Sequence, residues 1–201
     1  KLGYEYKFLE MNLKQERIFY KSKEFKEYLI FSDSCVSIPY FQSISTIPRL
    51  KGWIDSDAIF VNGNSGDFIS GGHIKSSFNK DSSSQINDER LDFIVKENIE
   101  KHFSLWGSLK NQENIKNIST QLQKEIQSDL TSSFNDVGFF EYSEFINRQS
   151  KYVISGQRAY EFYGYEWRLP LWDDEYLDFW SCVPIEYKLN QKLYINMLRN
   201  E

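Results

Sequence analysis

The sequence predicts an α/β fold, with the remnant of a parallel sheet near residues 4–9 and 57–63 and a larger helical portion packed against it. Residues 4–9 alternate apolar and polar side chains, which is the pattern of a strand. Residues 58–61 are a short apolar run that leads directly into a glycine-rich stretch. From residue 115 onward, apolar residues recur at the period of an amphipathic helix.

The first elements are separated by prolines. Residues 12–30 are rich in charged and helix-favouring residues, so we expect them to be helical. Pro39 and Pro48 end any long helix, because proline lacks a backbone donor and biases the preceding residue towards extended geometry. The run at 58–61 contains β-branched residues and is bounded by turn formers, which predicts a buried strand.

A glycine-rich loop follows this strand. Residues 63–72 contain four of the ten glycines of the chain. Residues 76–90 consist mostly of Ser, Asn and Asp, which predicts a flexible excursion with residues 80–84 at its tip.

The second half of the chain is expected to be mainly helical. A first helix is predicted from the apolar stripe Ile115, Ile118, Leu122, Ile126 and Leu130. A second helix, through residues 145–153, should end near Gly164, because glycine is common just after a helix. Residues 165–171 should be extended, since Pro170 disfavours a helix there.

Two shorter helices are expected at the end of the chain. Asp173 or Asp174 can cap a helix that ends before Pro184. The core stripe of the final helix is expected to be Leu189, Leu193 and Met197.

Composition excludes several classes of function. With 24 basic and 29 acidic residues the net charge is −5, which argues against nonspecific nucleic-acid binding because that role needs a basic face. The two cysteines and two histidines show no metal-ligand spacing. No apolar run approaches the length of a membrane helix and the first residues do not form a signal pattern, so no membrane span and a cytoplasmic location are expected.

The glycine-rich loop is the first candidate site, because ligands bind at the carboxyl ends of strands in open α/β sheets. The backbone of Gly63, Asn64, Ser65 and Gly66 could hold a phosphate, and Asp67 could hold its magnesium ion as a hard oxygen ligand. The alternative is a turn that only reverses the chain.

Arg168 and Lys192 are the other candidates. Arg168 lies two residues before Pro170 and could present its planar guanidinium to a phosphate or carboxylate, although a structural ion pair would use the same residue. Lys192 lies on the more polar face of the final helix, where a lysine is usually a solvated charge.

Two segments resemble the synthetase domain of asparagine synthetases. Residues 63–72 are similar to the family signature G-E-G-x-D-E-x-F-G-G, with Gly63, Asp67, Gly71 and Gly72 in register. Residues 166–173 are similar to the family's E-x-R-x-P-F-L-D segment. Two motifs in this order are more specific than either one. Residues 148–152 and the Pro-Leu-Trp-Asp sequence are similar to a divergent branch associated with polysaccharide or lipopolysaccharide biosynthesis.

The resemblance implies a partial adenine-nucleotide alpha hydrolase-like sheet (the PP-loop ATP pyrophosphatase fold) with a large helical C-terminal portion. Residues 1–201 would be a single domain that lacks its N-terminal part, with the residual sheet and glycine-rich loop in 1–75 and mainly helices in 76–201. The implied enzyme is an ATP-dependent ligase or amidotransferase of asparagine synthesis type.

Such an enzyme uses ATP and Mg²⁺ to adenylate a carboxylate substrate and then transfers nitrogen to it from ammonia or from a glutaminase domain or subunit. The resemblance implies that Asp67 is a catalytic residue and the ligand of the metal–pyrophosphate complex, and that Arg168 supports the site. The family's lysine is replaced by Ile195, and Lys192, one turn earlier, is expected to substitute for it.

The chain also departs from the family pattern. The family's S-G-G-x-D-S pyrophosphate loop is absent, so residues 1–201 alone are not expected to cleave ATP. Asn64 and Phe68 replace the two glutamates of the signature, and an amide cannot act as a general base. The alternative is a degenerate synthetase fold that binds a nucleotide or a partner without catalysis. A helical interaction domain is a third hypothesis, which the strand-to-loop junction disfavours.

Overall fold

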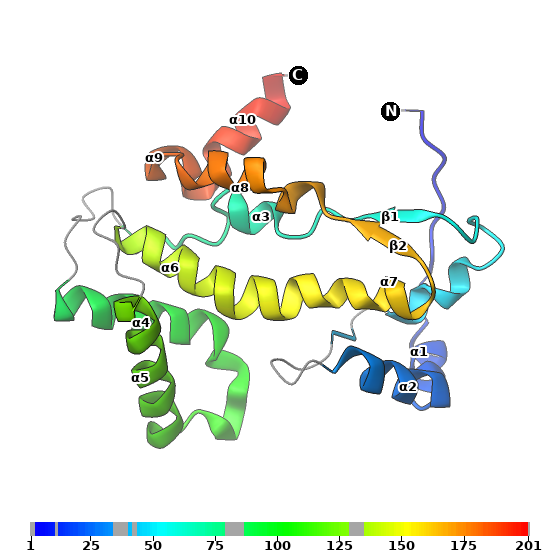
Figure 1. The fold of residues 1–201 in the computed structure, drawn as a ribbon, viewed down its shortest axis with the longest axis horizontal. Helices are drawn as coiled ribbons and strands as arrows, with labels where there is room; N and C mark the ends of the chain where they lie inside the picture. The colour runs from blue at the N-terminus through cyan, green and yellow to red at the C-terminus, as the bar shows by residue number, and fades with distance from the viewer. Residues whose placement is uncertain are drawn as a thin grey trace. The chain divides into compact units, whose positions relative to one another are not determined.

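The structure, a computed structural model, describes residues 3–10, 12–33, 40–41, 44–78, 87–128 and 135–200. These residues are mostly helical, with one small parallel sheet of two strands, which is compatible with the predicted α/β class (Figure 1). The chain divides into two compact units. The first comprises Lys1–Asn62 and Tyr152–Arg168, and the second comprises Gly63–Lys151 and Leu169–Glu201.

The first unit begins with two capped helices, α1 (Leu13–Phe19) and α2 (Lys23–Ser32). The Asn12 side chain accepts a hydrogen bond from the backbone N–H of Lys14 at 2.9 Å, and Ser22 caps α2 in the same way. Helix within residues 12–30 is therefore confirmed, as two helices. The unit also contains η1 (Ile44–Thr46), η2 (Pro48–Leu50), η5 (Ser155–Gln157) and α7 (Arg158–Phe162).

The sheet consists of β1 (Ile59–Val61) and β2 (Glu166–Arg168), which pair in parallel with Val61 opposite Arg168. A strand near 57–63 is confirmed, but the expectation that it is buried is wrong, because Ile59 and Val61 are 50% and 70% exposed. The strand expected at residues 4–9 is wrong, because residues 3–10 form no strand and Tyr4 is 84% exposed. An alternating pattern forms a strand only beside a hydrogen-bonding partner, and the partner of β1 comes from residues 166–168 instead.

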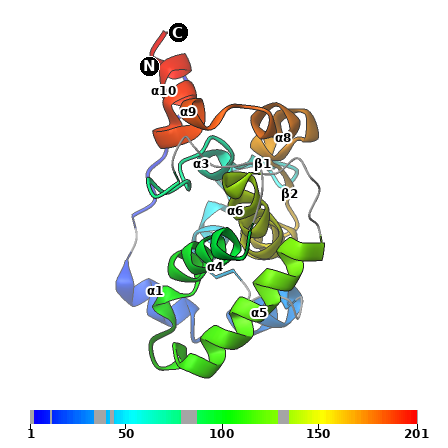
Figure 2. The ribbon, with the colours of Figure 1, turned by 90° about the vertical axis from the view of Figure 1, so that its left-hand side faces the viewer.

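The second unit is built around a continuous helical segment that starts with α6 (Asp136–Glu144). Figures 1 and 2 both show α4 and α5 on one side of α6, and α3 and α8 on the other. The remaining bounds are α3 (Gly66–Ile69), α4 (Asp88–His102), η3 (Ser104–Leu109), α5 (Gln112–Ser128), the π-helix η4 (Phe145–Ile154), η6 (Pro170–Trp172), α8 (Asp174–Ser181), α9 (Ile185–Lys188), η7 (Leu189–Gln191) and α10 (Lys192–Asn200).

The helix α6 is buried on more than one side, because helices cover it from both directions. Phe139 and Phe140 are consecutive residues of α6, and both are 0% exposed. Phe140 packs in the core shared with α4 and α5, whereas Phe145, at the start of η4, packs against the cluster of α3 and α8. A polar side chain carried by this segment is therefore removed from water, and its charge must be compensated by neighbouring groups.

Several helix predictions from local patterns are confirmed, but the core stripe expected for the final helix is wrong, because Met197 is 47% exposed and Leu189 precedes α10. Leu122 and Ile126 are buried on α5, whereas Leu130 lies outside the described residues. The helical segment through residues 145–153 ends before Gly164, and Asp173 caps α8. The loop tip at 80–84 also lies outside the described residues. No helix within the described ranges has the length and apolar character that a bilayer span requires.

Two motif glycines should respond differently to substitution. Gly71 has a φ of +91°, and an added Cβ would collide with the backbone carbonyl of Lys188. We therefore expect Gly71→Ala to lower the free energy of unfolding by about 1–3 kcal/mol. Gly63 has open space around an added Cβ, so Gly63→Ala is the matched control. Denaturant unfolding of both variants checks this, and equal stability would contradict the packing of Gly71.

Candidate functional site

The glycine-rich loop, defined as residues 63–73, leaves β1 and enters the short helix α3. Ser65 is 4% exposed and adopts a φ of 69°, a left-handed conformation that is uncommon for a residue with a Cβ. Its hydroxyl donates a hydrogen bond to Oε1 of Gln149 at 2.9 Å. The strained turn is therefore held by a buried side chain from outside the loop.

Gln149 lies on a π-helix of ten residues, Phe145–Ile154. The spacing of five residues is visible in two contacts: Gln149 Nε2 donates to Glu144 Oε1 at 2.9 Å, and Ser150 Oγ donates to the Phe145 carbonyl at 2.8 Å. In an α-helix, residues five apart point in different directions. The π-helical geometry thus allows Glu144 and Gln149 to face the same loop, and π-helical turns are frequent at functional sites.

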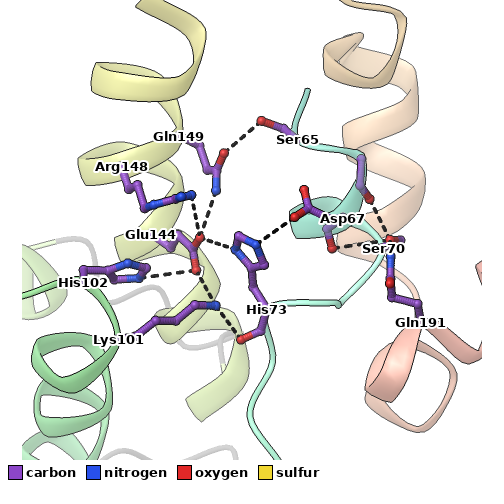
Figure 3. Close-up of polar contacts among 11 residues, drawn as sticks. Ser65, Asp67, Ser70, His73, Lys101, His102, Glu144, Arg148, Gln149 and Gln191 are labelled. Carbon is purple, nitrogen blue, oxygen red and sulfur yellow. Dashed lines mark hydrogen bonds and ion pairs between the residues drawn. The ribbon is translucent and has the colours of Figure 1, made fainter. Parts of the chain in front are cut away.

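Glu144, at the end of α6, is 0% exposed and lies among cationic side chains (Figure 3). Burial alone would raise its pKa, but the favourable interactions with His102 and His73 outweigh burial and hold the pKa far below its usual range. The carboxyl group is therefore ionised. Its partners are His73 Nδ1, Lys101 Nζ at 3.2 Å, His102 Nε2 at 3.4 Å, Arg148 Nη1 at 3.6 Å and Gln149 Nε2.

His73 joins this buried carboxylate to Asp67. Its Nδ1 contacts Glu144 Oε1 and its Nε2 lies 3.0 Å from Asp67 Oδ2. Burial lowers the pKa of His73, but the hydrogen bonds to the two carboxylates outweigh it, so the net pKa is raised. The hydrogen bond from His73 in turn lowers the pKa of Asp67. The site therefore favours an imidazolium between two carboxylates.

These contacts clamp both ends of the loop. Four contacts connect these residues in series: Ser65 with Gln149, Gln149 with Glu144, Glu144 with His73, and His73 with Asp67 (Figure 3). We call these five residues the loop clamp. Within the loop, the Gly72 N–H donates to the Asp67 carbonyl at 2.8 Å, which tightens the turn further. The position of the Asp67 carboxylate is thus set by buried groups, although the carboxylate itself is 67% exposed.

Asp67 fits the role of a magnesium ligand shared with a phosphate. Mg²⁺ is usually held by one or two carboxylates together with waters and substrate phosphates, and Asp67 offers an ionised, exposed carboxylate. Within the described ranges, no group of three or more acidic, histidine or cysteine side chains could hold a metal ion by itself. Asp67 could therefore be one ligand of a magnesium ion that other groups also hold.

The other predicted site residues lie outside the loop clamp. Arg168, in the first unit, is exposed and pairs with Glu166 Oε2 at 2.9 Å. Lys192 is exposed at the start of α10, where its Nζ lies 5.7 Å from the ring centroid of Tyr187. Gly63 and Asn64 precede the clamped part of the loop, whereas Gly66 packs against Leu171. The loop clamp therefore contains two of the predicted site residues, Ser65 and Asp67.

Glu144, Gln149 and His73 are central residues of the site that sequence reasoning did not assign. His73 directly follows the motif glycines. Gln149 lies within residues 148–152, whose similarity to the divergent branch assigned it no role, and Glu144 belongs to no motif. Comparisons of the chain with family models, with curated proteins and with solved structures give no match.

Gln149 is expected to protect the glycine-rich loop from local opening more than it protects the distant helix α5. Gln149→Met keeps the approximate size but removes both hydrogen bonds, leaving the Ser65 hydroxyl and Glu144 with one partner fewer. We expect a loss of about 1–3 kcal/mol of stability, and amide hydrogen exchange within residues 65–73 should accelerate more than exchange in α5. Gln121→Met, at an exposed position of α5, is the control. Unchanged exchange in the loop would refute the clamp.

Proposed function

We propose that this chain contributes to an ATP-dependent ligase or amidotransferase that resembles asparagine synthetases and acts on a carboxylate, and that it uses Asp67 to hold the magnesium–pyrophosphate complex. The observation that carries the proposal is the pairing of the two motif regions. β1 leads into the loop at 63–73, β2 begins the segment at 166–173, and the two strands are parallel neighbours. Their carboxyl ends therefore lie at one edge of the sheet, where α/β proteins bind ligands.

The contact between Gly66 and Leu171 supports the same proposal within the second unit. Gly66 belongs to the first motif and Leu171 to the second, and a Cβ on Gly66 would collide with the Leu171 side chain. The two motifs are thus packed closely, and the glycine permits the close approach. When bound, Mg²⁺ would neutralise charge on the pyrophosphate. The loop clamp would keep the Asp67 carboxylate oriented towards it.

Product analysis of the native full-length protein tests the proposal. The protein is incubated with ATP, Mg²⁺, ammonium and a panel of carboxylic acids, and phosphorus NMR follows the nucleotide. We expect AMP and pyrophosphate to form only when a suitable acid is present. Formation of ADP and phosphate would point to a different activation chemistry and would reject adenylation.

One observation favours a second candidate, a catalytically degenerate synthetase fold. Phe68 stands where the family signature has a glutamate, and its side chain is 5% exposed within the cluster that contains Ile69 and Trp180. A carboxylate at this position would be buried in an apolar environment, so the position serves the core here. This candidate predicts saturable ATP binding by the full-length protein without AMP formation across the acid panel.

A further inference from the structure

A cavity of about 670 Å³ lies within the second unit, beside α3, α6 and α8. Its apolar wall is formed by Phe68, Ile69, Tyr142, Phe145, Leu177 and Trp180. A volume of this size is typical of sites for small organic ligands. The cavity is lined by none of the five loop-clamp residues, and it takes no part in the function proposed above.

One ion pair in the lining, Lys188 with Glu141, carries no net charge. Lys188 Nζ donates to Glu141 Oε2 at 2.7 Å, and the side chains of Lys188 and Glu141 are 7% and 17% exposed. The lysine charge is therefore compensated within the wall. It is not available to attract an anionic ligand.

Two further carboxylates in the lining are not compensated. Asp174 and Asp178 are exposed, lie four residues apart on one face of α8, and pair with no cation among the described residues. With Glu141 and Lys188, the lining carries three acidic groups and one basic group, a net charge of −2. Asp174 lies in the first turn of α8, where the helix dipole favours a carboxylate, whereas Asp178 lies one turn further along the helix.

The aromatic part of the wall complements this charge. The faces of Phe, Tyr and Trp rings attract cations, most strongly where water is excluded. Trp180 lines the cavity and is 3% exposed. A carboxylate ligand would be repelled by Asp174 and Asp178, whereas a cationic ligand would be attracted by both.

We propose that this cavity binds an organic cation, an ammonium group carried on an aromatic or branched apolar body. The apolar body packs against the aromatic side chains in the wall. The ammonium group pairs with Asp174 and Asp178 on α8. The proposal is independent of ATP chemistry, because it needs only the cavity and its charges.

Three probes of matched shape test the proposal on the whole chain: 2-phenylethylammonium, 2-phenylethanol and 3-phenylpropionate. Binding is measured by calorimetry and by the NMR shift of the Trp180 indole N–H. We expect saturable binding of the ammonium probe, about tenfold weaker binding of the alcohol, and no binding of the carboxylate. Equal affinities of the cation and the alcohol, or no binding of the cation, would overturn the proposal.

Variants separate the charge from the cavity. The double variant Asp174→Asn and Asp178→Asn should bind the ammonium probe about tenfold more weakly and bind the alcohol probe with unchanged affinity. Asp92→Asn, at an exposed position of α4 outside the cavity, should change neither affinity. Leu177→Trp should fill the cavity and block both probes. Circular dichroism verifies that each variant is folded. If the double variant binds the ammonium probe as tightly as the wild type does, the assignment of the two aspartates is wrong.

Discussion

Replacing Asp67 by asparagine is expected to lower AMP formation by the native full-length protein on the order of 100-fold or more. Asparagine has the same shape but no charge, and a neutral amide is a poor substitute for a carboxylate on Mg²⁺. Because the Asp67 side chain is 67% exposed, the substitution should leave the fold intact. Initial rates measured across a magnesium titration separate a lost metal ligand from an unfolded protein.

Asp57→Asn is the matched control for this experiment. Asp57 is also exposed, and it lies in the turn before β1. Its removal should leave the rate and the magnesium dependence unchanged. An Asp67→Asn protein that works at the wild-type rate would show that Asp67 has no role in the reaction.

Replacing Glu144 by glutamine is expected to lower the free energy of unfolding by about 3 kcal/mol. The substitution keeps the size of the side chain but removes the negative charge shared by His73, Lys101 and His102. These three side chains are each at most 20% exposed, so water replaces little of the lost interaction. Chemical denaturation at neutral pH measures the difference.

The same variant predicts a pH dependence. The pKa of Glu144 in the folded protein lies below its usual value of 4.5. The carboxylate therefore stabilises the fold fully above pH 4.5, and this contribution is lost as the pH falls through the folded pKa. The difference in free energy of unfolding between the wild type and Glu144→Gln should therefore become smaller as the pH falls below 4.5.

Glu113→Gln, at an exposed position in the first turn of α5, is the control, with an expected change of about 0.5 kcal/mol or less. If Glu144→Gln behaves like this control, the carboxylate is not the centre of the cluster.

The parts of the fold that follow from local signals were predictable. The helix pair at the start of the first unit, the cap at Asp173 and the helix end before Gly164 depend on residues within a few positions of each other. Strand pairing depends on residues far apart in the chain. Residues 4–9 have the pattern of a strand but no partner, whereas β1 pairs with a segment that the sequence marks only as extended.

The candidate site was predictable only in its loop. The glycine spacing pointed to Asp67, and the structure holds that side chain in a defined network. Glu144 is one of 29 acidic residues and belongs to no motif, so only tertiary packing distinguishes it. Gln149 depends in addition on a π-helix, because α-helical periodicity would point it away from Glu144.

The most direct test of the proposed function follows one oxygen atom. The native full-length protein is supplied with ATP, Mg²⁺ and a carboxylic acid substrate whose carboxylate carries heavy oxygen, and the nucleotide product is analysed by mass spectrometry. Adenylation joins a carboxylate oxygen to the α-phosphorus, so transfer of nitrogen to the acyl group leaves that oxygen in AMP. We predict AMP that contains one heavy oxygen. Unlabelled AMP, or labelled phosphate released with ADP, would contradict an acyl-adenylate and with it the proposed function.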